Sequence, residues 1–192
     1  MATKLLKPFR DYSEHNVLNL FSYAGGVPVD GVGAGTVVYI ANDYKQSDGN
    51  ISNFLDLSSV DNTVSSLFST VGKVSAVVNY DDLPAPIGIT LKDIREIDEN
   101  GTPLIYEPRM CAERNIVLPH QAVPILTKGV VLIGDIDKTD RVNGGLTTDP
   151  VGGDPVYVGD NGRIATDGEI VIGKFLSSPD VDGFALILLN VI

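Results

Sequence analysis

The stretch that decides the fold class is residues 155–176, PVYVGDNGRIATDGEIVIGKFL. Residues 155–158 are rich in β-branched and aromatic side chains, which favour a strand. Asp160, Asn161 and Gly162 follow, and Asn-Gly accepts the positive φ angles of a tight turn, so we predict a hairpin there. Residues 163–166 form the second strand of this hairpin. Asp167 and Gly168 then form another turn, which leads into a third strand over residues 169–176. Replacing Gly162 by Val should therefore destabilise the fold by about 1 kcal/mol or more.

Sequence patterns typical of strands and turns extend in both directions from this stretch. Further strands are predicted at residues 17–23, 36–40 (TVVYI), 73–80 (KVSAVVNY), 87–91, 115–118, 123–127, 130–136 and 184–191. Only two short segments have helical features, residues 61–71 and 108–114. The sequence therefore predicts an all-β fold. We expect a sandwich-like or barrel-like body with an extended N-terminal arm and at most short helices.

Three regions follow from these patterns. Residues 1–20 form an N-terminal arm, residues 21–114 an N-terminal β region with insertions, and residues 115–192 a C-terminal β unit. The arm mixes basic, proline and polar residues, and chain ends of this kind stay loose unless a partner holds them. An alternative is that residues 17–23 are simply the first strand of the body and the basic tip is a disordered tail.

Charge limits the possible partners. The chain has a net charge of −11, but its first ten residues carry Lys4, Lys7 and Arg10 and no acid. The arm tip is therefore +3 and the rest −14. Duplex DNA and anionic membranes repel so acidic a protein, so we expect neither as a partner. The single cysteine excludes an intrachain disulfide, and the N-terminus has no apolar signal-peptide core, so we expect synthesis in the cytoplasm.

The residues that could carry catalysis lack a supporting motif. His15 and His120 are the only histidines, and no nucleophile elbow accompanies them. Cys111 is interpreted as a structural thiol rather than a nucleophile. The acids at 135, 137 and 140 hint at calcium but lack the glycine and distal glutamate of an EF-hand, so solvated acids are favoured. The glycine-rich residues 31–35 precede a strand rather than opening a helix. We expect no enzyme, no cofactor, no metal and no small-molecule substrate.

Several segments, in order along the chain, resemble capsid decoration (cement) proteins of tailed bacteriophages. They are residues 11–21 (DYSEHNVLNLF), 91–101 (LKDIREIDENG), 121–129 (QAVPILTKG), 153–158 (GDPVYV) and 172–176 (IGKFL), together with the turn at 160–162. The resemblance implies a late structural protein of the virion. It would bind the outer capsid surface, with the major capsid protein as its partner, and would associate with itself, as a homotrimer.

The arm is the predicted clamp on the capsid. It combines a basic tip with apolar side chains that can anchor on a partner, and an extended segment can add a strand to an exposed sheet edge. The residues expected to bind the capsid are Lys4, Leu5, Lys7, Phe9, Arg10, Tyr12, Val17, Leu18 and Leu20.

Two other functions remain open. The first is a carbohydrate-binding or host-surface-binding β module of a phage fibre, which would present exposed aromatic side chains. The tyrosines here lie mostly in predicted strands, where packing in the core is the default. The second is a small hydrolase, for which turnover of a substrate would be the evidence.

Overall fold

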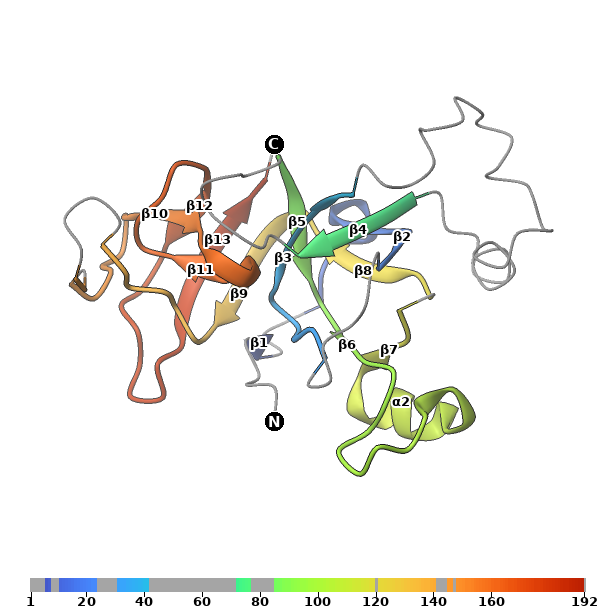
Figure 1. The fold of residues 1–192 in the computed structure, drawn as a ribbon. Helices are drawn as coiled ribbons and strands as arrows, with labels where there is room; N and C mark the ends of the chain where they lie inside the picture. Colours follow the sequence, from blue (N-terminus) through green and yellow to red (C-terminus); the bar gives the residue numbers. More distant parts are fainter. Residues whose placement is uncertain are drawn as a thin grey trace.

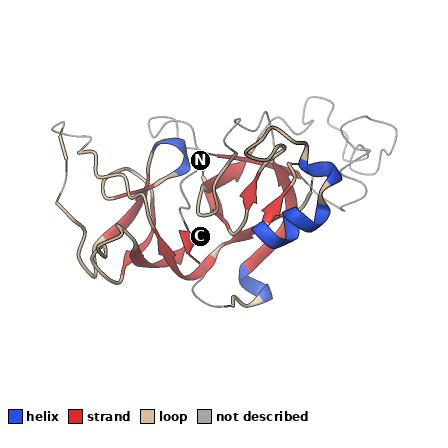
Figure 2. Ribbon diagram, turned by 90° about the horizontal axis from the view of Figure 1, so that it is seen from below, coloured by secondary structure: helices blue, strands red, loops and turns tan. Residues whose placement is uncertain are grey.

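The computed structural model describes residues 6–7, 11–23, 31–41, 72–76, 85–119, 121–140, 145–146 and 148–191. These residues form a six-stranded sheet, a five-stranded barrel, a two-stranded sheet and little helix, so the all-β prediction is confirmed (Figures 1 and 2). Among them, no helix has the length and apolar character needed to cross a membrane. The second predicted helix, residues 61–71, lies outside the described residues.

Five strands close into a barrel in the order β2-β4-β3-β5-β8. The strands are β2 (Val17–Tyr23), β3 (Val37–Ile40), β4 (Gly72–Ala76), β5 (Pro86–Thr90) and β8 (Val123–Leu126). All neighbours are antiparallel except β2 and β4, which run parallel. Val38, Val74, Val123 and Ile125 are completely buried in one apolar cluster of this barrel. Closure removes the free edges that an open sheet would expose.

The second sheet has six strands in the order β1-β9-β13-β12-β10-β11, all antiparallel. They are β1 (Leu6–Lys7), β9 (Lys128–Ile133), β10 (Pro155–Val158), β11 (Ile164–Ala165), β12 (Val171–Phe175) and β13 (Ala185–Asn190). The longest pairing is between β9 and β13, from Ala185 opposite Ile133 to Asn190 opposite Lys128. Alternation buries Val131 and Ile133 of β9 and turns their neighbours outward.

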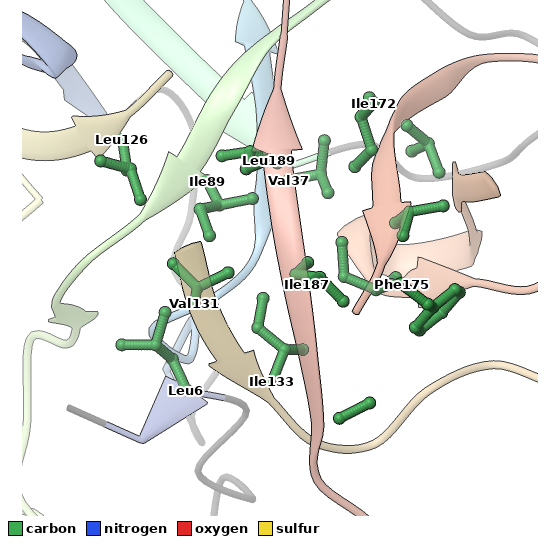
Figure 3. Packing of buried hydrophobic residues seen from close by; sticks show 14 residues of the cluster. Leu6, Val37, Ile89, Leu126, Val131, Ile133, Ile172, Phe175, Ile187 and Leu189 are labelled. Carbon is green, nitrogen blue, oxygen red and sulfur yellow. The ribbon is translucent and has the colours of Figure 1, made fainter. Parts of the chain in front are cut away.

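One apolar core joins the two sheets. Val37, Ile89 and Leu126 of the barrel belong to the same buried cluster as Ile187 and Phe175 of the six-stranded sheet (Figure 3). Removing apolar surface from water stabilises by about 25 cal/mol per Å², so this shared cluster holds the sheet and the barrel together. The predicted boundary at residue 115 therefore does not match the layers. Strand β8 lies in the barrel, and β1, from the other end of the chain, lies in the six-stranded sheet.

A small lobe is inserted between β5 and β8. It contains the parallel pair β6 (Asp93–Ile94) and β7 (Ile116–Val117), the 3-10 turn η4 (Leu104–Tyr106) and the helix α2 (Pro108–Arg114). The helix begins with proline at its first position and ends at Asn115, which adopts a left-handed conformation (φ 59°). The helix predicted for residues 108–114 is confirmed.

The lobe is held by its own contacts. Leu104, Cys111 and Ile116 form a separate buried cluster. In the turn before it, Asp98 Oδ1 accepts hydrogen bonds from the backbone amides of Thr102 (2.7 Å) and Asn100 (2.8 Å). These bonds, that from Thr102 first, hold the pKa of Asp98 below its ordinary value.

The hairpin predicted at residues 160–162 is present. Strands β10 and β11 pair antiparallel across the turn η5 (Asp160–Gly162), in which Asn161 and Gly162 have φ angles of 56° and 69°. Gly162 also lies against the barrel, because a Cβ atom added to it would be 2.7 Å from the Val37 carbonyl oxygen. The turn therefore needs glycine for its backbone conformation and for its close approach to β3.

Candidate binding surfaces

Residues 6–7 of the predicted arm join the protein's own six-stranded sheet, and residues 17–20 join the barrel as part of β2. Leu6 pairs with Ile133 and Lys7 with Leu132, so β1 is an edge strand of that sheet. The Leu6 side chain is only 9% exposed and belongs to the shared core. These two residues of the predicted arm therefore pack on the protein's own body, because pairing with β9 satisfies the backbone and burial satisfies the apolar Leu6 side chain.

Four of the nine predicted capsid-binding residues, Lys4, Leu5, Phe9 and Arg10, lie outside the described residues. Lys7 is partly exposed; its Nζ lies 3.7 Å from the centre of the Phe184 ring and 3.4 Å from a carboxylate oxygen of Asp182. An exposed ion pair of this kind adds little stability. The structure thus places Lys7 at the rim of the sheet, tied to the loop that joins β12 and β13.

The other predicted residues divide between core and surface. Tyr12 and Val17 pack against the shared core, and Leu18 packs against the barrel cluster. Leu20 is 46% exposed on the outside of the barrel. Strand β2 coincides with the predicted strand at residues 17–23, and the structure gives it a place inside the body. Among the described members only Leu20 is exposed, whereas Lys7, Tyr12, Val17 and Leu18 are partly buried.

The two candidate catalytic residues that the structure describes, His15 and Cys111, lie in different elements. His15 is exposed in the 3-10 turn η1 (Glu14–Asn16), and His120 lies outside the described residues. Cys111 is buried, its Sγ donates a hydrogen bond to the Leu104 carbonyl oxygen (3.5 Å), and burial raises the pKa of its thiol. In the part of the chain that the structure describes, no three His, Cys, Asp or Glu side chains are grouped to hold a metal ion.

The acids at 135 and 137 have structural partners. Asp135, which has a positive φ of 54°, forms an ion pair with Arg163. Asp137 Oδ1 accepts hydrogen bonds from the backbone amide (3.0 Å) and the hydroxyl (2.6 Å) of Thr139. These contacts fix the loop that follows β9.

The outer face of the six-stranded sheet combines apolar and basic side chains. Lys128 stands opposite Asn190, and Lys174 stands opposite Leu188, so these residues share the face away from the core. With Val171 and Gly173 they line an open hollow of about 600 Å³. Neither lysine forms an ion pair with any part of the chain that the structure describes. This face therefore carries two positive charges, although the net charge of the whole chain is −11.

Exposed apolar side chains also occur at several places away from this face, and the lobe and the β12–β13 loop are two of them. In the lobe, Ile105 is 61% and Tyr106 79% exposed. In the loop between β12 and β13, Val181 is completely exposed. Single exposed apolar residues are ordinary, but neighbouring ones are typical of contact surfaces.

The sequence interpretation missed these surfaces. Alternation within residues 128–133 and 171–175 could have placed the two lysines among outward-facing apolar residues. For the lobe residues no local signal exists, because a leucine, an isoleucine and a tyrosine in one short turn do not show which of them is buried. Of the chain's tyrosines, Tyr23 is buried, as expected for a strand residue, whereas Tyr106 is exposed. No protein family model matches the chain, and no curated protein matches its sequence.

Proposed function

We propose that this protein is a structural component of a tailed-phage virion that binds the outer surface of the capsid and stabilises the head. The observation that carries the proposal is the distribution of exposed apolar side chains. They include side chains on the lobe, on the outer sheet face and on the β12–β13 loop of one body with a shared core. A protein that bridges neighbours needs several separate contact sites on one body, whereas a single-pocket protein needs only one.

The lobe is the proposed contact with the major capsid protein. Ile105 and Tyr106 are adjacent and exposed, and tyrosine is among the side chains that most often anchor protein interfaces. The lobe has its own buried cluster, so it presents these side chains on a fixed support. The acidic net charge of the chain supports solubility at the high copy number that such a protein requires.

The test is binding to phage heads assembled without the protein. Wild-type protein should sediment with the heads and raise the temperature at which they release DNA. The double variant Ile105→Ser, Tyr106→Ser should bind much more weakly. Ile40→Ser is the matched control, since Ile40 is an exposed apolar residue (48%) on the barrel. Failure of the wild-type protein to bind heads would refute the proposal, and loss of binding in the control alone would refute the role of the lobe.

The N-terminal residues need a separate test. Deleting residues 2–5 removes Lys4 and Leu5, two of the predicted clamp residues, and leaves the Leu6 contact with the core intact. We expect the deletion to weaken head binding without lowering the melting temperature of the free protein. Unchanged head binding would remove these residues from the proposed contact.

Tyr106 also supports the second candidate, a carbohydrate-binding or host-surface-binding module. An exposed aromatic ring is the usual platform for a sugar, and this ring is 79% exposed. Binding to a glycan array that Tyr106→Ser abolishes, together with no binding to heads, would favour this candidate over the capsid role.

A further inference from the structure

The loop between β12 and β13 presents an apolar tip between two carboxylates. Val181 is completely exposed, and Asp180 and Asp182 beside it are exposed as well. The loop is closed on itself, because the Asp180 amide donates to the Phe184 carbonyl oxygen (2.8 Å). In addition, Asp180 Oδ1 accepts from the amides of Asp182 (3.0 Å) and Phe184 (2.8 Å). A tip held in this way loses little conformational freedom on binding.

The hollow on the outer sheet face has the opposite character. Val171 and Leu188 provide exposed apolar surface, and Lys128 and Lys174 provide two positive charges. Among the residues that the structure describes, no acidic side chain lines it. Its volume of about 600 Å³ is within the range of ordinary ligand sites, roughly 300–1,000 Å³, so it has room for a loop tip of several residues.

From this complementarity we infer that the Val181 tip of one copy docks into the hollow of a second copy of this chain. Val181 contacts Val171 and Leu188, and the flanking aspartates face Lys128 and Lys174, with Asp182 exchanging its exposed and weak pair with Lys7 for this contact. The apolar contact supplies the attraction, and the charges set the orientation. The inference concerns contacts between copies and does not depend on capsid binding.

The tip and the hollow of one molecule are placed for contact between molecules. Lys128 begins β9 and Asn190 ends β13, so this side of the hollow lies at one end of the β9–β13 pair. The tip joins the other end of β13 to β12 (Figure 1). Because the two surfaces differ, the contact is head-to-tail, and such contacts build either closed rings or open chains.

Two single variants should each abolish the contact. Val181→Lys replaces the apolar tip by a positive charge, which the lysines of the hollow repel. Lys174→Glu places a negative charge on one side of the hollow, which repels the aspartates of the tip. Both side chains are exposed, so neither change disturbs the core. Sedimentation equilibrium over a range of concentrations should show that the wild-type protein associates. Each variant should raise the dissociation constant of this association about tenfold or more.

Mixing the two variants is the decisive step. In the mixture, the intact tip of Lys174→Glu meets the intact hollow of Val181→Lys, so association should return at equimolar ratio. Val151→Lys and Lys92→Glu are matched controls that make the same chemical changes at a second exposed apolar position and at a lysine outside the hollow. Both controls should associate like the wild type.

The inference is overturned by any of three results. One is a wild-type protein that stays monomeric at every concentration. Another is association that survives Val181→Lys or Lys174→Glu, or that the controls also remove. The last is a mixture of the two variants that remains monomeric. None of these results depends on phage heads, so the inference can fail while the capsid proposal stands, and the reverse.

Discussion

Replacing Gly162 by Ala tests the contact between the β10–β11 hairpin and the barrel. Gly162 has a φ of 69°, and an added Cβ atom would lie 2.5 Å from Thr36 Cγ2 and 2.7 Å from the Val37 carbonyl oxygen. The left-handed backbone costs about 1–2 kcal/mol for a residue with a Cβ atom. Overpacking against a strand that cannot move freely costs about 1–3 kcal/mol more. We expect Gly162→Ala to lower the free energy of unfolding by about 2–5 kcal/mol, and Gly162→Val by more.

Gly183→Ala is the matched control. Gly183 has a similar φ of 81°, but nothing lies within 4 Å of an added Cβ atom, so this variant has the backbone cost alone. Urea unfolding followed by tyrosine fluorescence and far-UV circular dichroism measures both variants. For a chain of this size, each kcal/mol corresponds to about 2–4 °C in melting temperature. A Gly162→Ala variant no less stable than Gly183→Ala would refute the close contact between the hairpin and β3.

Three further predictions concern single side chains. Cys111 should react with iodoacetamide far more slowly in the native protein than in urea, because burial raises the pKa of its thiol; equal rates would show that the lobe opens readily. The amide hydrogen bonds to Asp98 lower its pKa in the folded protein. Their contribution to stability is therefore fully present at pH values above the ordinary pKa of about 3.8 and is lost as the pH falls through the lower pKa of the folded state. Urea unfolding should therefore show Asp98→Ala less stable than wild type at neutral pH and the difference shrinking in acid; a difference independent of pH would contradict this. Leu6→Ala should lower the free energy of unfolding by about 2 kcal/mol or more, and Leu20→Ala, at an exposed position, by under about 0.5 kcal/mol; equal effects would place Leu6 outside the core.

Local features were predictable because local sequence determines them. Strand β2 and helix α2 have the bounds that side-chain patterns predicted, and the hairpin turn follows from Asn161 and Gly162. In each case the deciding factor is a preference of a few neighbouring residues: β-branched side chains for a strand, or residues that accept a positive φ for a tight turn.

The assignment of strands to sheets was not predictable in this way. Strands β8 and β9 are separated only by Thr127, yet they belong to different sheets. Both are rich in β-branched and apolar residues, so their patterns are similar. What separates them is their partners, since β8 pairs with β2 and β5, and β9 pairs with β1 and β13. Pairings between residues far apart in sequence leave no mark in either segment alone.

For the N-terminal segment, too, the sequence alone did not show what its apolar side chains contact. Apolar side chains in a terminal arm predict burial, but hydrophobic burial has no direction and does not distinguish the protein's own core from a partner. The structure uses Leu6, Val17 and Leu18 inside the body and leaves Leu20 exposed. A partner can gain only from surface that the body leaves open. The exposed residues of the lobe, the outer sheet face and the β12–β13 loop are therefore stronger candidates for contacts between proteins than the buried members of the arm.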